Sequence, residues 1–171
     1  EDLILNNEDL ILLTGNYNNF FGKLFYANKT KYFEKIIEKL KSSFKDRLYI
    51  EIQRHTESKE VNYENYLLKI SSLYSLPLIA GQEVYYLDSG MAEAHDALMC
   101  IGNKEFIDDQ NRFRYSNQHY LKKSEEIKKL YKDIPEALEN NYNFPLRFNF
   151  KQKKSKPILP SISNNKNISA E

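Results

Sequence analysis

Residues 47–55 read Arg-Leu-Tyr-Ile-Glu-Ile-Gln-Arg-His, and this stretch decides the fold class. Its aliphatic side chains alternate with polar or aromatic ones, as the pleat of a β-strand requires. Residues 63–74 then carry apolar side chains at helical spacing, and residues 77–80, Pro-Leu-Ile-Ala, form a short apolar run typical of a strand buried on both faces. A strand, a helix and a strand in this order predict two parallel neighbours joined by a right-handed crossover.

The segments before this unit continue the alternation of strands and helices. Residues 10–14, Leu-Ile-Leu-Leu-Thr, predict a buried strand that ends at Gly15 and Asn16, a pair that tolerates positive φ. Apolar periodicity predicts a short helix near residues 20–25 and a longer one over residues 30–41. The fold class is therefore α/β with mostly parallel strands. The inward face of the longer helix is expected to hold Tyr32, Phe33, Ile36, Ile37 and Leu40, and that of the helix over residues 63–74 to hold Tyr63, Tyr66, Leu67, Ile70 and Leu73.

The pattern changes after residue 86. A helix is predicted over residues 91–101, ended by Gly102 and Asn103, and a polar loop follows to residue 115. Further helical stretches are expected up to residue 131 and from Pro135 towards residue 142. The chain is then basic and extended. The inward stripe of the helix over residues 91–101 is expected to be Met91, Ala94, Leu98 and Ile101.

Length and composition bound the class of protein. The 171 residues suit one domain and a tail. A net charge of +1 does not by itself indicate any class of binding partner. A single cysteine, Cys100, excludes an internal disulfide framework and fits a reducing cytosol, so we expect a cytoplasmic protein. We expect no membrane segment, because no apolar run approaches the ~20 residues of a span. Since the chain opens at Glu1 without Met, we expect it to be a fragment of a longer protein.

Five segments, in this order and at these intervals, resemble bacterial DNA polymerase III alpha subunits, over the later part of their N-terminal PHP (polymerase and histidinol phosphatase) domain and the lead-in to the palm. The resemblance covers residues 10 to about 160, and its third segment is the most specific, because an Ala-rich helix alone would not predict a His-Asp pair. The segments are residues 48–55, 76–80, 92–101 (Ala-Glu-Ala-His-Asp-Ala-Leu-Met-Cys-Ile), 111–116 (Asn-Arg-Phe-Arg-Tyr-Ser) and 134–140 (Ile-Pro-Glu-Ala-Leu-Glu-Asn).

This resemblance implies a domain organisation. Residues 1–102 would form the C-terminal part of a PHP-like distorted β/α barrel, and residues 103–150 would be a loop and helices packing on it. Residues 151–171 would be an extended linker towards the palm. The polymerase carboxylates and their Mg²⁺ would lie in the absent palm, so no cofactor is expected in this piece. Expected partners are the rest of the alpha subunit, the proofreading exonuclease subunit and, indirectly, DNA.

The resemblance also implies where metal ligands would lie if this chain had them. Relatives that bind metals place Cys or His after the first strand, where this chain has Asn16. They place Asp-x-His after the strand at residues 77–80, where this chain has Glu83, Val84 and Tyr85. An amide is a weak neutral ligand and a phenol of pKa ~10 seldom loses its proton to a metal. We therefore expect a PHP scaffold with no metal and no catalytic residue.

The histidines and Glu83 each admit a second interpretation. His55 could be a ligand or general base, although a strand-end His is more often satisfied by a loop carbonyl. His95 beside Asp96 invites a catalytic pair, but adjacent helix residues do not face each other, which favours packing. Glu83 is more simply a solvated or Lys-paired carboxylate than an acid–base group. Cys100 is expected in the core and His119 on the surface.

Basic groups near an aromatic ring indicate possible contact with nucleic acid. Arg112 and Arg114 flank Phe113, and Lys153 and Lys154 lie in the basic run over residues 151–156. Such groups can hold a phosphate backbone, whereas a lysine run in an Asn-rich linker is more usually just solvated.

Three functions remain open at this point. The first is a structural and docking region of a replicative DNA-directed DNA polymerase, a nucleotidyltransferase. The second is an active metal-dependent PHP phosphoesterase or 3′–5′ exonuclease. The third is an unrelated α/β domain that shares these segments by chance, which the ordered run of matches argues against.

Overall fold

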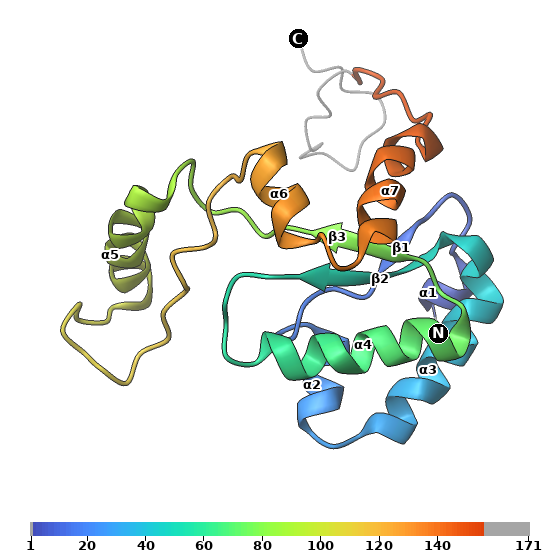
Figure 1. The fold of residues 1–171 in the computed structure, drawn as a ribbon, viewed down its shortest axis with the longest axis horizontal. Coiled ribbons are helices and arrows are strands. Elements are labelled where there is room, and N and C mark those ends of the chain that lie inside the picture. Colours follow the sequence, from blue (N-terminus) through green and yellow to red (C-terminus); the bar gives the residue numbers. More distant parts are fainter. Residues whose placement is uncertain (1, 156–171) are drawn as a thin grey trace, which may run out of the picture.

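The centre of the fold is a parallel three-stranded sheet. The computed structural model describes residues 2–155, and Figure 1 shows their path. The strands are β1 (Leu12–Leu13), β2 (Leu48–Gln53) and β3 (Leu78–Gly81), in the order β1-β2-β3. Leu12 pairs with Leu48, and Ile50 pairs with Leu78. The α/β class, the parallel pairing and the central βαβ unit are confirmed, and this open sheet is compatible with part of a barrel.

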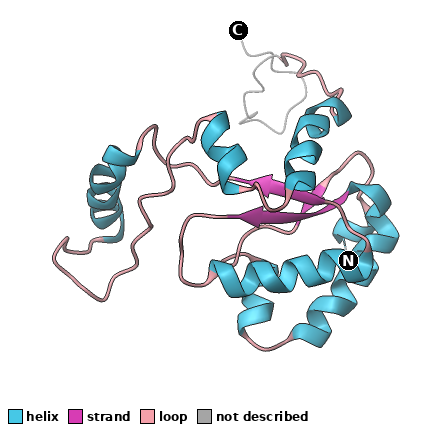
Figure 2. Cartoon of the chain, viewed as in Figure 1, coloured by secondary structure: helices cyan, strands magenta, loops and turns pink. Residues whose placement is uncertain are grey.

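Helices cover both faces of the sheet, as the ribbon and the secondary-structure colouring show (Figures 1 and 2). On one side lie α2 (Phe20–Tyr26), α3 (Thr30–Phe44) and α4 (Glu60–Tyr74), and on the other α6 (Ser124–Leu130) and α7 (Pro135–Asn143). The described chain also contains short elements: α1 (Asp2–Leu5) and the 3₁₀ turns η1 (Lys45–Arg47), η2 (Ser89–Met91) and η3 (Phe144–Arg147).

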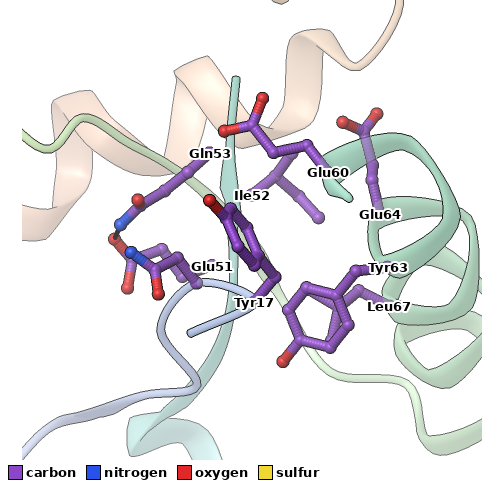
Figure 3. A pocket seen from close by; sticks show the side chains of 9 residues that line it. Tyr17, Glu51, Ile52, Gln53, Glu60, Tyr63, Glu64 and Leu67 are labelled. Atoms are coloured by element: carbon purple, nitrogen blue, oxygen red, sulfur yellow. Dashed lines mark hydrogen bonds between the residues drawn. The ribbon is translucent and has the colours of Figure 1, made fainter. Parts of the chain in front are cut away.

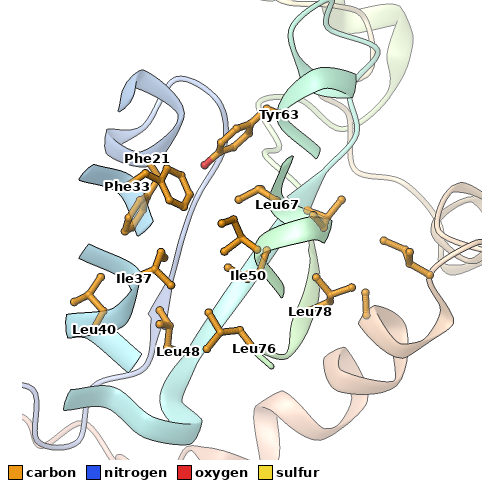
Figure 4. Close-up of a cluster of buried hydrophobic side chains, with 14 of the residues drawn as sticks. Phe21, Phe33, Ile37, Leu40, Leu48, Ile50, Tyr63, Leu67, Leu76 and Leu78 are labelled. Carbon is orange, nitrogen blue, oxygen red and sulfur yellow. The ribbon is translucent and has the colours of Figure 1, made fainter. Parts of the chain in front are cut away.

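The core joins the sheet to α3, α4 and α7. Helix α3 contributes Phe33, Ile37 and Leu40, which meet the aliphatic face of β2 (Figure 4). Two sequence predictions about inward faces are wrong, because Tyr32 on α3 and Leu73 on α4 are exposed. Phe33 beside Tyr32 and Ile70 one turn before Leu73 are fully buried, so each exposed residue lies on the flank of its apolar stripe and not at its centre. The other predicted inward residues of the two helices are buried or packed against the core.

Helix α7 covers the outer edge of β3 with side-chain amides. The Asn141 amide accepts a hydrogen bond from the Ala80 N–H (3.0 Å) and donates one to the Ala80 carbonyl (2.8 Å). Asn140 donates to the Leu78 carbonyl at 2.7 Å. Peptide groups at a sheet edge need partners, so these two amides take the place of a neighbouring strand. Pro135 occupies the first turn of α7, as predicted.

Helix α5 (Ala92–Asn103) stands away from the sheet at the end of two long connections (Figure 1). The prediction of its inward stripe is wrong: Met91, Ala94, Leu98 and Ile101 share a face, but all four are exposed. The four residues do share one helix face, as their spacing predicts. Spacing alone does not show whether that face is buried in the core of the chain.

Residues 151–155 are exposed and have no regular secondary structure, and an extended linker over residues 151–171 stays a prediction. The rest of that linker prediction, residues 156–171, lies outside the described residues. Within residues 2–155, the helices are too short or too polar to cross a membrane.

Candidate functional site

The carboxyl ends of the three strands bring together the candidate residues that follow them. Asn16 comes after β1, His55 after β2, and Glu83 and Tyr85 after β3. The parallel arrangement places these ends at one edge of the sheet, where α/β folds hold their ligands. The geometry of each side chain decides what this edge can do.

His55 is buried and both of its ring nitrogens are engaged. Its Nδ1 lies 3.0 Å from Glu60 Oε1, and its Nε2 lies 3.1 Å from the Glu83 backbone nitrogen. Because the Glu83 N–H must donate, we infer that Nε2 is the acceptor and Nδ1 carries the proton. The expected loop-carbonyl partner is therefore wrong: a carboxylate and an amide satisfy this ring. Neither nitrogen is left for a metal or a substrate.

Glu60 holds His55 in place from the first position of α4. Besides the His55 ring, its carboxylate accepts hydrogen bonds from the backbone N–H groups of His55 (2.7 Å) and Glu57 (3.0 Å). A carboxylate at a helix N-terminus can accept several backbone N–H groups at once, as Glu60 does here. Glu60 is thus a structural anchor of the loop between β2 and α4.

Asn16 and Glu83 bind each other. The Asn16 amide donates to Glu83 Oε2 at 3.1 Å, and the Asn16 side-chain oxygen accepts from the Asn18 N–H at 3.0 Å. Glu83 was expected to be solvated or paired with a lysine; it is half-buried, and one carboxylate oxygen accepts a hydrogen bond from an amide instead of a lysine. The two residues are far apart in the sequence, so no local pattern predicts this contact.

Tyr85 belongs to an aromatic cluster that extends to α5. Its hydroxyl donates to the Tyr115 hydroxyl at 3.2 Å, and its ring stacks on His95 at 5.1 Å. Burial, followed by the hydrogen bond to Tyr115, raises the pKa of Tyr85, so the phenol keeps its proton. The packing role predicted for His95 is confirmed, because its ring also lies 5.5 Å from that of Tyr86.

His119 is a residue that sequence reasoning missed, since it was expected on the surface and is buried. Its Nδ1 lies 3.1 Å from the Glu83 carbonyl oxygen, and its Nε2 lies 3.5 Å from Glu57 Oε1, too far for a hydrogen bond. Burial, and then the neighbouring His55, lower the pKa of His119. The segment around His119 runs beside residues 85–86, joined by the Tyr85 N–H to the His119 carbonyl and the Leu121 N–H to the Tyr86 carbonyl. No local pattern marks that pairing.

A small cavity lies beside this edge, lined by Tyr17, Glu51, Gln53, Glu60 and Tyr63 among others (Figure 3). The Gln53 amide donates to Glu51 within it at 2.6 Å. Its volume of about 10 Å³ admits about one water molecule, so it cannot hold a substrate. Over the described part of the chain, no three His, Cys, Asp or Glu side chains converge to hold a metal ion.

The basic residues predicted to contact nucleic acid divide into two kinds. Arg112 is buried and forms a two-pronged ion pair with Asp96, which lowers the pKa of that carboxyl. This pairing argues against a phosphate contact by Arg112. Arg114, Lys153 and Lys154 are exposed, and their contact with nucleic acid stays a prediction. Cys100 is buried, as expected.

Comparison with known proteins extends the resemblance beyond the motifs. The chain is 36% identical to the DNA polymerase III subunit alpha of Caulobacter vibrioides over 157 residues, which is 92% of this chain and 14% of that protein. It is 36% identical to the subunit of Rickettsia bellii over 166 residues, 95% of this chain and 14% of that protein. It is 30% identical to that of Pseudomonas fluorescens over 155 residues, 90% of this chain and 13% of that protein.

No protein-family model matches the chain. The chain spans about one seventh of the length of these curated relatives. The resemblance seen in the motifs is nevertheless confirmed, because it runs through nearly the whole of this chain in several bacteria. The chain is therefore similar, over most of its length, to one segment of bacterial DNA polymerase III alpha subunits.

Proposed function

We propose that this chain serves a replicative DNA polymerase alpha subunit as a metal-free PHP-type scaffold. The proposal rests on one observation: the side chains that could have bound a metal are already engaged in hydrogen bonds within the protein. The Asn16 amide donates to Glu83, the Tyr85 phenol donates to Tyr115, and the His55 Nε2 accepts from a backbone N–H. A metal centre needs deprotonated donors or free lone pairs pointing at a common point. These residues do not fit such a centre.

In this proposal the chemistry lies outside this chain. Nucleotidyl transfer to DNA would be performed by carboxylates and Mg²⁺ of a palm in the cytoplasmic alpha subunit, and this piece would support that palm. The exposed Arg114, Lys153 and Lys154 would assist by contacting DNA. The scaffold would also offer a docking surface to the proofreading exonuclease subunit.

A second candidate is a metal-dependent phosphoesterase or 3′–5′ exonuclease. One observation favours it: the buried His119 Nε2 has no hydrogen-bond partner within residues 2–155 and faces the Glu57 carboxylate at 3.5 Å. A neutral imidazole and a carboxylate can share an ion. Two ligands alone bind weakly, however, and the neighbouring donors are engaged, so the scaffold is the better supported function.

A nuclease assay separates the two candidates. The full chain is incubated with a labelled single-stranded oligonucleotide and with Mn²⁺ or Zn²⁺, beside the variants Glu57→Gln and His119→Gln. We expect the same background cleavage in all samples. Cleavage by the wild-type chain that both variants lose would establish the second candidate. Docking is tested separately by size-exclusion chromatography with the proofreading subunit of the same organism, where co-elution is expected and separate elution would contradict it.

A further inference from the structure

Helix α5 exposes an apolar face that the described residues 2–155 leave uncovered. Met91, Leu98 and Ile101 lie on one face with Ala94, at intervals of three and four residues. Their exposed fractions are 42%, 65% and 76%. Single exposed apolar side chains are common, but a stripe along three turns of one helix is the pattern by which helices dock on each other.

The outward direction of this stripe is fixed by contacts on the other side of α5. Asp96 forms the two-pronged ion pair with Arg112, whose side chain is 1% exposed. Cys100 is buried, and His95 stacks on Tyr85. The helix ends in a closed cap, where Lys104 adopts a left-handed conformation and its N–H points at the carbonyls of the last turn. Helix α5 is therefore held firmly, and the stripe cannot turn inward without breaking an ion pair.

The net charge of the segment that carries the stripe indicates what kind of partner would cover it. Residues 87–115, which include α5 and its two connections, contain six carboxylates and three basic side chains, a net charge of −3 in a chain of net charge +1. Asp96 and Arg112 neutralise each other, which leaves the other acidic groups facing solvent. An acidic surface attracts a basic protein segment and repels anionic lipid.

We propose that the stripe of Met91, Ala94, Leu98 and Ile101 is a docking surface for an amphipathic helix of a partner protein. That helix would carry apolar side chains on one face and Lys or Arg beside them. Helix α5 has 12 residues and is about 18 Å long, so about three turns of the partner would cover it. The inference stands apart from the metal-free scaffold, since it uses none of the residues at the strand ends.

The test uses two fluorescent synthetic peptides of equal length with the same leucine stripe. One has lysines beside the stripe and the other has glutamates in their place. Anisotropy is measured against the full chain, the double variant Leu98→Ser with Ile101→Ser, and the control double variant Val61→Ser with Leu73→Ser. The control removes two side chains of similar exposure on α4. Urea unfolding of each variant checks that the fold is intact.

We expect the lysine peptide to bind the wild-type chain saturably and the glutamate peptide to bind at least about fivefold more weakly, a difference that shrinks in high salt. The α5 variant should lose about tenfold or more in affinity for the lysine peptide, and the α4 variant should keep it. Equal binding of the two peptides, no saturable binding, or equal loss in both variants would overturn the proposal. A chain dimer that the α5 variant abolishes in sedimentation, or vesicle binding that it abolishes, would also overturn it.

Discussion

The imidazole ring of His119 stacks on the ring of His55, with centroids 4.1 Å apart and planes 3° apart. Both rings contact the backbone of Glu83. His55 Nε2 accepts a hydrogen bond from the Glu83 N–H, and His119 Nδ1 lies within hydrogen-bond distance of the Glu83 carbonyl oxygen. Both residues are 2% exposed. Burial, and then the neighbouring His55, lower the pKa of His119, because a charged His119 ring would be both poorly solvated and repelled. The contact between His119 and the segment after β3 is therefore sensitive to a drop in pH.

The first prediction concerns the pH dependence of stability. The folded-state pKa of His119 lies below its ordinary value of 6.5, so from pH 6.5 downward the unfolded chain takes up a proton that the folded chain does not. The free energy of unfolding should therefore fall as the pH is lowered from 6.5 towards the folded pKa, and should gain nothing from this group above pH 6.5. Urea unfolding at pH 7.5 and pH 5.5 measures the fall.

NMR titration of the His119 ring provides the control for this prediction. A ring signal that titrates at pH 6.5 or above would contradict it. The variant His119→Gln should flatten the pH dependence of the free energy of unfolding between pH 5.5 and 7.5.

The second prediction concerns the hydroxyl of Tyr131, which lies between two strands. This buried phenol is 3.1 Å from the Ile52 carbonyl and 2.9 Å from the Gly81 carbonyl. Tyr131→Phe should lower the free energy of unfolding by about 1–2 kcal/mol, because a buried acceptor loses its donor. Tyr142→Phe is the matched control, since Tyr142 is exposed. Equal urea midpoints for the two variants would show that the Tyr131 hydroxyl does not join the strands.

The third prediction concerns Arg54, which ties β2 to α4 and to the α6–α7 turn. Its guanidinium donates to Glu64 at 3.0 Å and 2.5 Å, and to both oxygens of Asp133 at 2.7 Å. Arg54→Ala should destabilise the chain by about 1–3 kcal/mol, because the partly buried Glu64 carboxylate and the exposed Asp133 carboxylate both lose their partner. Lys128→Ala removes an exposed ion pair with Glu125 and should leave the free energy of unfolding close to that of the wild-type chain. If Arg54→Ala and Lys128→Ala lose similar amounts of stability in thermal and urea unfolding, Arg54 does not tie these elements together.

The fourth prediction compares two glycines in helices. A Cβ on Gly22 in α2 would lie 2.0 Å from the Tyr17 carbonyl oxygen, a backbone atom that cannot easily move. Gly22→Ala should therefore destabilise by about 1–3 kcal/mol. A Cβ on Gly102 near the end of α5 meets nothing within 4 Å, so Gly102→Ala should be neutral or stabilising by up to about 1 kcal/mol. A stable Gly22→Ala variant would mean that the Tyr17 loop can give way.

Periodicity in the sequence was enough to predict the sheet and its helices. The alternation in residues 48–53 and the apolar run that holds β3 identify parallel strands, because buried strands tolerate few polar side chains. Periodicity could not tell which way the stripe of α5 faces, since an apolar stripe fits a core and a docking surface equally well.

The candidate site was less predictable, because its contacts join distant residues. Asn16 and Glu83 are 67 residues apart, and Ser116 donates to the Glu57 carboxylate across 59 residues. Sequence located the strand ends and therefore Asn16, His55 and Glu83. Sequence analysis missed His119. Backbone hydrogen bonds to residues 85–86 bring this residue to the site, and no local apolar pattern predicts them.

Isothermal titration calorimetry with Zn²⁺ and with Mn²⁺ tests most directly whether the strand ends form an empty scaffold. The full chain should give only heats of dilution, because the Asn16, His55 and Tyr85 donors are already engaged. The variant Glu83→Gln is titrated beside it and should give the same trace. Saturable uptake of about one or more ions per chain with micromolar or tighter affinity, lost in Glu83→Gln, would contradict the metal-free scaffold.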